Sequence, residues 1–156
     1  MQRPVDYIHG RIGLLGMLAL LALSPAICEE VLFRGFILSA LRRRLPLWSG
    51  VIIVGLLFGA MHLNVYRLFA ATLSGVVLTY LVWRSGSIVT SMIAHFIING
   101  GLILLETNYI PRLTDALYVP VKDGGTLSPV VLGCAAAVLI LGVVLMEWRT
   151  PRPSNA

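Results

Sequence analysis

Charged residues are scarce in this chain of 156 residues, at 12% of the total, which is about half the share found in soluble domains. Apolar residues instead make up 58%, and the mean hydropathy is +0.89. This composition excludes a soluble globular enzyme, a disordered chain and a nucleic-acid-binding module. The chain is therefore predicted to be an integral membrane protein, with the lipid bilayer as a partner and no nucleic acid.

Cysteine and lysine are also rare. The two cysteines, Cys28 and Cys134, lie in apolar stretches where a disulfide is not expected. No small-residue cleavage site follows the apolar residues 12–23, so no cleavable signal peptide is predicted. The net charge of +5 comes mainly from arginines between apolar runs, with one cluster at 42–44. Such a cluster is typical of the cytoplasmic end of a span, which favours a cytoplasmic C-terminus. The expected location is the plasma (inner) membrane of a prokaryote.

Five apolar segments have about the length needed to span a bilayer. The first, 12–41, would be about 45 Å long as one helix, so we predict a kink, break or restart of the helix at Ser24-Pro25. The others cover residues 47–63, 68–83, 88–105 and 130–146. A polar loop with proline and glycine is expected at 106–128. The predicted fold class is all-α, a polytopic helical membrane protein of about five transmembrane helices in a single domain over 1–156.

Ionisable side chains inside these spans are functional candidates, because each is costly in hydrocarbon. They are Glu29, Glu30, Arg34, His62 and His95, with Asn99 as a polar neighbour. Counted from the arginine-rich side, Glu29 and Asn99 lie about 18 Å deep, His62 about 22 Å and His95 about 12 Å. Three separate spans thus place polar groups near one depth, which predicts one polar site within the membrane.

The spacing of these residues suggests different tasks. Glu30 and Arg34 are one helical turn apart, so an ion pair that supports the site is expected. Glu29 points away from that pair, and a carboxylate without its own cation suits a general base or acid. His95 and Asn99 share a face, and together with His62 they provide a second base and donors for an oxyanion.

Three motifs formed by these residues resemble the CPBP family, the intramembrane glutamic proteases related to type II CAAX prenyl endopeptidases. They are Glu29-Glu30-Val31-Leu32-Phe33-Arg34, Phe58-Gly59-Ala60-Met61-His62 and His95-Phe96-Ile97-Ile98-Asn99. They occur in order, on separate apolar spans, within a motif-bearing core of about 24–101.

The resemblance implies a role for each motif residue. Glu29 and His62 would activate the attacking water, and His95 and Asn99 would stabilise the tetrahedral oxyanion. Glu30 and Arg34 would hold the catalytic residues in position. The reaction would require no metal and no other cofactor. Phe58 is expected to pack, and the spacing of Gly55 and Gly59 predicts close approach of a neighbouring helix.

The resemblance also implies an endopeptidase that cleaves a membrane-associated protein or peptide. CAAX-like processing, leader removal and cleavage of a C-terminal tail all remain open as substrates. Larger family members carry several spans before the first motif, whereas residues 1–28 have room for one. We therefore expect a smaller substrate cavity, or one that a partner subunit completes.

Three other readings of the same residues stay open. Glu29, His62 and His95 form a possible catalytic zinc set, although no HExxH motif is present. Cys28 is a possible nucleophile, although the two carboxylates beside it disfavour the thiolate. The buried polar groups also fit a non-catalytic membrane protein, such as a proton relay or an immunity or scaffold protein.

Overall fold

The computed structural model describes residues 4–107, 109, 118–119 and 126–127. The chain divides into two units, Met1–Thr107 and Asn108–Ala156. In the second unit, β1 (Tyr118–Val119) and β2 (Thr126–Leu127) form a short antiparallel ladder within the predicted loop. The predicted span at 130–146 lies outside the described residues, and the single-domain organisation stays a prediction.

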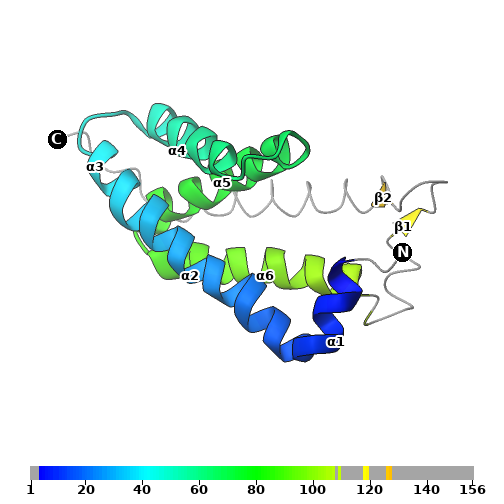
Figure 1. The fold of residues 1–156 in the computed structure, drawn as a ribbon. Helices are drawn as coiled ribbons and strands as arrows, with labels where there is room; N and C mark the ends of the chain where they lie inside the picture. Colours follow the sequence, from blue (N-terminus) through cyan, green and yellow to red (C-terminus); the bar gives the residue numbers. More distant parts are fainter. Residues whose placement is uncertain (1–3, 108, 110–117, 120–125, 128–156) are drawn as a thin grey trace. The chain divides into compact units, whose positions relative to one another are not determined.

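The first predicted span is a long run of helical segments that follow one another without a loop (Figure 1). The segments are α1 (Pro4–Met17), η1 (Leu18–Leu23), α2 (Ser24–Glu30), η2 (Val31–Leu38) and α3 (Ser39–Leu41). The segments η1 and η2 are π-helical, a geometry that is frequent at functional sites. They flank α2, the segment that contains the two adjacent glutamates.

At Ser24-Pro25 the α-helix restarts as α2 after the π-helical η1, as predicted, whereas the non-helical backbone angles lie at Gly13. Gly13 has φ 65° and ψ 176°, a backbone conformation that side chains with a Cβ rarely adopt. Figure 1 shows the chain changing direction within α1. At Ser24, directly before Pro25, the backbone keeps helical angles of φ −60° and ψ −50°. Pro25 stands in the first turn of α2, where its missing N–H is tolerated.

The next three helices match three predicted spans closely. They are α4 (Leu47–Met61), α5 (Val65–Ser85) and α6 (Ile88–Glu106). The segments Tyr7–Leu41, Arg67–Ser85 and Ile88–Glu106 are long and apolar enough to cross a membrane, and α4 is a shorter apolar helix. Together with many exposed large apolar side chains, these helices confirm an all-α integral membrane protein.

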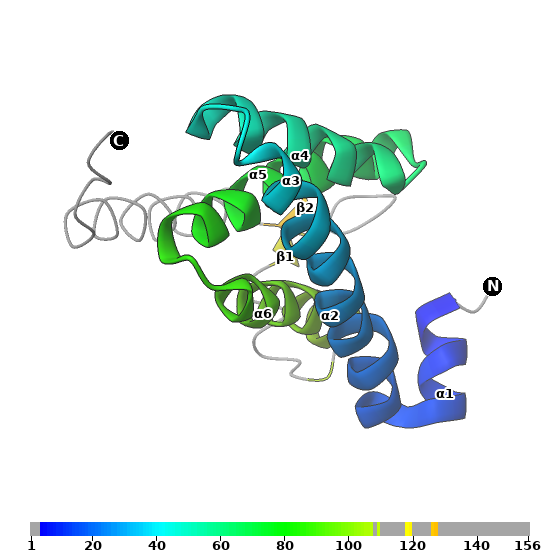
Figure 2. The ribbon, with the colours of Figure 1, turned by 90° about the vertical axis from the view of Figure 1, so that its left-hand side faces the viewer.

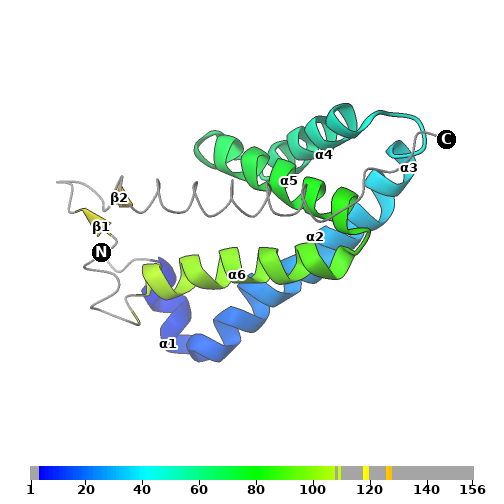
Figure 3. The same cartoon turned by 180° about the vertical axis from the view of Figure 1, so that it is seen from behind.

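Helix α4 packs along α5, and α6 contacts both α5 and the α2 region (Figures 2 and 3). A turn connects α4 to α5, in which Leu63 has the unusual positive φ of 48° and Asn64 accepts a hydrogen bond from the Arg67 N–H. This turn ends α4 at Met61, two residues before the predicted end of the span. It places His62 at the C-terminal end of α4.

Glycines make the contact between α4 and α5 possible, as the spacing of Gly55 and Gly59 predicts. A Cβ on Gly55 would overlap Val76, and one on Gly59 would overlap the Thr72 hydroxyl. On the other side, a Cβ on Gly75 would lie 3.0 Å from the Gly55 Cα atom. The backbones of α4 and α5 therefore lie closer together at these glycines than they could if a Cβ atom were present. Such close packing at small residues is typical of membrane helices.

We expect Gly59→Ala to lower the free energy of unfolding by about 1–3 kcal/mol, because the added methyl group collides with the α5 backbone and Thr72. The matched control is Gly101→Ala in α6, where a Cβ meets nothing within 4 Å. Since alanine favours helices, this control should be neutral or slightly stabilising. Unfolding of both variants in detergent measures the difference, and equal stability would contradict the packing of α4 on α5.

Candidate active site

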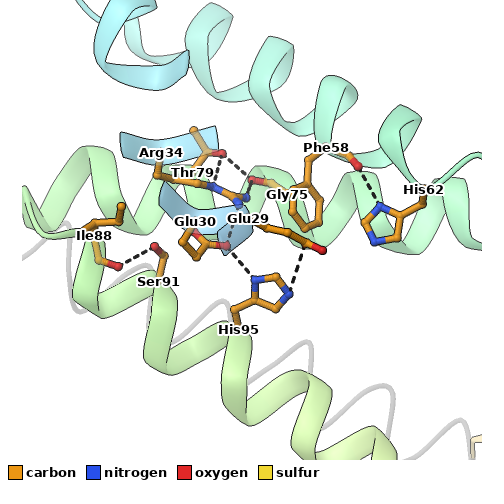
Figure 4. Close-up of polar contacts among 10 residues, drawn as sticks. All are labelled: Glu29, Glu30, Arg34, Phe58, His62, Gly75, Thr79, Ile88, Ser91 and His95. Atoms are coloured by element: carbon orange, nitrogen blue, oxygen red, sulfur yellow. Dashed lines mark hydrogen bonds and ion pairs between the residues drawn. The ribbon is translucent and has the colours of Figure 1, made fainter. Parts of the chain in front are cut away.

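A pocket of about 570 Å³ gathers the four residues predicted to be catalytic. Glu29 reaches it from α2, His62 from the end of α4, and His95 and Asn99 from α6. Figure 4 shows Glu29, His62 and His95 converging from these three segments. The structure thus brings together side chains that are up to 70 residues apart in sequence.

Behind the pocket, Glu30 and Arg34 form the predicted ion pair. Arg34 Nη1 donates to Glu30 Oε1 at 2.7 Å, and both side chains are completely buried. A buried charge pair needs further hydrogen bonds to offset its lost hydration. Arg34 makes these further hydrogen bonds to acceptors on α5. Its Nη2 atom donates to the Gly75 carbonyl oxygen at 3.0 Å, and its Nε atom donates to Thr79 Oγ1 at 3.3 Å (Figure 4).

The ring of Phe58 lies between Arg34 and the histidines. The guanidinium carbon of Arg34 is 4.7 Å from the centre of this ring. The rings of His62 and His95 lie 5.2 and 5.8 Å from it, centre to centre. Phe58 is buried and forms part of the pocket wall, which agrees with the packing role predicted for it.

His95 contacts both glutamates of the first motif. Its Nδ1 lies 2.8 Å from Glu30 Oε1, the oxygen that also accepts from Arg34. An ionised carboxylate can only accept, so Nδ1 carries the proton in this contact. The other ring nitrogen, Nε2, lies 3.9 Å from Glu29 Oε2. Glu30 therefore fixes the orientation of His95, as carboxylates do for metal-bound and catalytic histidines.

His62 is oriented by the backbone of its own helix. Its Nδ1 lies 2.9 Å from the carbonyl oxygen of Phe58, one turn earlier. Because a carbonyl oxygen only accepts, Nδ1 donates the proton, and Nε2 of the neutral ring is left as an acceptor.

Glu29 differs from Glu30 in its partners. Its Oε2 atom is buried and makes no hydrogen bond within the described part of the chain. Its side chain is 24% exposed, since Glu29 also lines the pocket. A buried carboxylate oxygen without a hydrogen bond, next to a cavity, is available to accept a proton from a bound molecule.

Several contacts of the site were not predicted from the sequence. Ser74 and Thr79 are polar residues in the middle of an apolar span. Their position in the sequence could have indicated that α5 also contributes to the site. Thr79 holds Arg34, and Ser74 lines the pocket. Arg67 and Glu106, at the ends of α5 and α6, line the pocket as well.

The alternative chemistries fit this geometry less well. Within residues 4–107, no three His, Cys, Asp or Glu side chains are close enough together to hold one metal ion. Cys28 is exposed and is not among the residues that line the pocket.

The apolar helices and the pocket between them define the class: an integral membrane protein with a pocket that ionisable side chains line. A family model described as Rce1-like, type II CAAX prenyl endopeptidase Rce1-like, matches residues 11–101. This match covers more than half of the chain and all three motifs, so the chain belongs to this family and is an intramembrane CAAX-type endopeptidase. No curated protein and no solved structure gives a significant match.

Proposed function

We propose that the chain is a metal-independent endopeptidase of the glutamic type. In this proposal Glu29 and His62 activate a water molecule, and His95 and Asn99 stabilise the oxyanion. The observation that carries the proposal is the difference between the two adjacent glutamates. Oε1 of Glu30 binds Arg34 and His95, and Glu30 does not line the pocket. Glu29 borders the pocket and has no hydrogen bond at Oε2 within the described residues, whereas the Oε2 atom of Glu30, also without a hydrogen bond there, is buried away from the pocket.

The proposed reaction is the hydrolysis of one peptide bond. Glu29 takes a proton from water while the Nε2 atom of His62 accepts a hydrogen bond from the same water. The water oxygen attacks the carbonyl carbon, and the carbonyl oxygen becomes an oxyanion. Asn99 Nδ2, together with His95 Nε2 when the ring is doubly protonated, donates to this oxyanion. The proton held by Glu29 then passes to the leaving nitrogen as the C–N bond breaks.

Glu30 and Arg34 act as positioning residues in this scheme. Glu30 Oε1 orients the His95 ring through Nδ1, and Arg34 connects Glu30 to α5. Because the pair is buried and bound on several sides, it holds α2, α5 and α6 in register around the pocket.

We further propose that the substrate is a membrane-associated protein or peptide. CAAX-like processing, leader removal and cleavage of a C-terminal tail each present a peptide to a pocket between apolar helices. The proposed location is the plasma membrane of a prokaryote. The arginine cluster at 42–44 favours an orientation with the C-terminus in the cytoplasm. A partner subunit that completes the substrate cavity is also part of this proposal.

Chelation tests the metal independence of the reaction. We expect the purified protein to keep its full rate of peptide cleavage after treatment with a tight zinc chelator, because a carboxylate and two imidazoles suffice to activate water. The measurement is cleavage of an internally quenched peptide before and after chelation. Loss of activity that added Zn²⁺ restores would support the zinc alternative with Glu29, His62 and His95 as ligands.

Replacing Glu29 by glutamine tests the glutamic mechanism itself. The cleavage rate of this variant should fall to a small fraction of the wild-type rate. A rate close to wild type would contradict the proposal, whatever the result of chelation.

A further inference from the structure

The three arginines that follow α3 do not share one environment. Arg42 Nη2 donates to the Trp83 carbonyl oxygen at 3.1 Å, and the Arg42 guanidinium carbon lies 5.2 Å from the centre of a Trp83 ring. Arg43 and Arg44 are exposed, and in the described part of the chain their side chains make no hydrogen bond or ion pair. The proposed hydrolysis uses neither of them.

Arg43 and Arg44 line a groove of about 610 Å³ that shares no lining residue with the catalytic pocket. The rest of the groove lies along η2 and α3, where its main lining residues are Gly35, Phe36, Ser39 and Ala40. Three of these residues are small, and the ring of Phe36 is 74% exposed. The groove therefore has an apolar part along the helix and a basic end. We call it the arginine groove.

The backbone at the basic end is held in place by the turn that ends α3. The N–H groups of Arg44 and Leu45 both donate to the Leu41 carbonyl oxygen, at 2.9 Å each. Cations are favoured at the C-terminal end of a helix, which gives the two free arginines a structural explanation. However, neither guanidinium binds a carbonyl oxygen of the described residues, so both remain available to a ligand.

No carboxylate of the described residues neutralises this basic end. The acidic residues in those ranges are Asp6, Glu29, Glu30 and Glu106. Glu29 and Glu30 lie about three helical turns before the end of α3, and Glu29 and Glu106 line the catalytic pocket. Asp6 belongs to α1, at the opposite end of this run of helical segments (Figure 1). Two cations without a counter-charge favour an anionic ligand.

Aromatic residues indicate the level of the arginine groove in the membrane. Trp48, just after the turn, is 59% exposed and stacks on Tyr80 with 5.6 Å between ring centres. Trp83 lies beneath Arg42 at the same end of the helices. Because tryptophan and tyrosine gather at the membrane interface, the basic end lies at the level of the lipid headgroups. The apolar part then extends towards the hydrocarbon, so a ligand that fills both parts has an anionic head and an apolar chain.

We propose that the arginine groove binds one anionic phospholipid. Its phosphate accepts hydrogen bonds from Arg43 and Arg44, and an acyl chain lies along Phe36 and Ala40. A guanidinium suits this task, because it can donate two parallel hydrogen bonds to one phosphate. The bound lipid connects the turn to η2, the segment that contains Arg34, and thereby stabilises the folded chain. The site does not depend on the proposed hydrolysis.

Lipid binding to the full chain tests this inference directly. The probes are phosphatidylglycerol and phosphatidylcholine with identical acyl chains, titrated onto the protein in a neutral detergent, and native mass spectrometry counts the bound lipids. We expect one phosphatidylglycerol to bind about tenfold more tightly than phosphatidylcholine. An arginine near anionic lipid contributes about fivefold to binding, so Arg43→Gln/Arg44→Gln should lower the affinity for phosphatidylglycerol to that for phosphatidylcholine.

Two variants serve as matched controls. Arg42→Gln removes the neighbouring charge, which is bound to Trp83 and does not line the groove, so it should weaken binding by less than about twofold. Ala40→Phe keeps all three arginines and fills the apolar part of the groove, so it should weaken binding of phosphatidylglycerol by about fivefold or more.

Thermal unfolding provides a second measurement. Ala40, Arg43 and Arg44 are exposed, so their variants should unfold like wild type in lipid-free detergent. Added phosphatidylglycerol should raise the unfolding temperature of wild type and leave that of Arg43→Gln/Arg44→Gln nearly unchanged.

Four results would overturn the proposal. The first is equal binding of the two lipids by wild type. The second is an equal loss in Arg42→Gln and Arg43→Gln, which would indicate a diffuse surface charge. The third is unchanged binding by Ala40→Phe, which would exclude the groove. The fourth is displacement of phosphatidylglycerol by an equal concentration of inorganic phosphate, which would assign the arginines to a free anion.

Discussion

Replacing Glu29 by glutamine is expected to lower kcat for peptide cleavage by about 10³-fold, with a much smaller change in KM. Glutamine keeps the size of the side chain but cannot take the proton from water, and a positioned general base contributes about 10²–10⁴-fold to a rate. A fall in kcat with little change in KM indicates loss of an interaction made in the transition state. Steady-state cleavage of a quenched peptide in nanodiscs measures both constants.

The matched control for this substitution is Cys28→Ala, one residue earlier on the same helix. Cys28 is exposed and does not line the pocket, so this variant should cleave at close to the wild-type rate. Loss of turnover in Cys28→Ala would instead favour thiol chemistry. If Glu29→Gln kept its biological activity while wild type cleaved nothing, the protein would act as an immunity or scaffold protein.

The membrane fold was largely predictable because long apolar runs and short polar turns indicate where helices begin and end. The predicted spans 68–83 and 88–105 agree with α5 and α6 to within a few residues. Pro25 marked the restart of the α-helix at α2, because proline is tolerated in a first turn, but the break at Gly13 was missed. Gly13 instead permits the sharp change of direction, and nothing in its neighbouring sequence distinguishes it from the other glycines.

The grouping of the site was predictable for a different reason. A polar side chain in an apolar span is costly, so Glu29, His62 and His95 were expected to meet, and they line one pocket. Which atoms pair could not be predicted, because pairing depends on how each helix is rotated about its axis. Glu30 therefore appeared to be a partner of Arg34 alone, although the same oxygen atom also contacts His95.

Arg34 gives the second large expected effect, this time on stability. We expect Arg34→Gln to lower the free energy of unfolding by about 3–5 kcal/mol, because it leaves the fully buried carboxylate of Glu30 without its cation. The substitution also removes the bonds to Thr79 and Gly75, which connect η2 to α5. Unfolding in detergent, followed by circular dichroism against denaturant, measures the loss.

Arg42→Gln is the matched control, because it tests whether the loss of stability depends on the burial of the arginine and not only on the contacts that it makes. Arg42 also donates to a backbone carbonyl oxygen and lies over an aromatic ring, both of Trp83, but it is exposed. Its substitution should therefore cost about 1 kcal/mol or less. The double variant Glu30→Gln/Arg34→Gln should recover part of the stability lost in Arg34→Gln, because no unpaired charge then remains buried. If Arg34→Gln were as stable as Arg42→Gln, the buried pair would not be what holds α5 to η2.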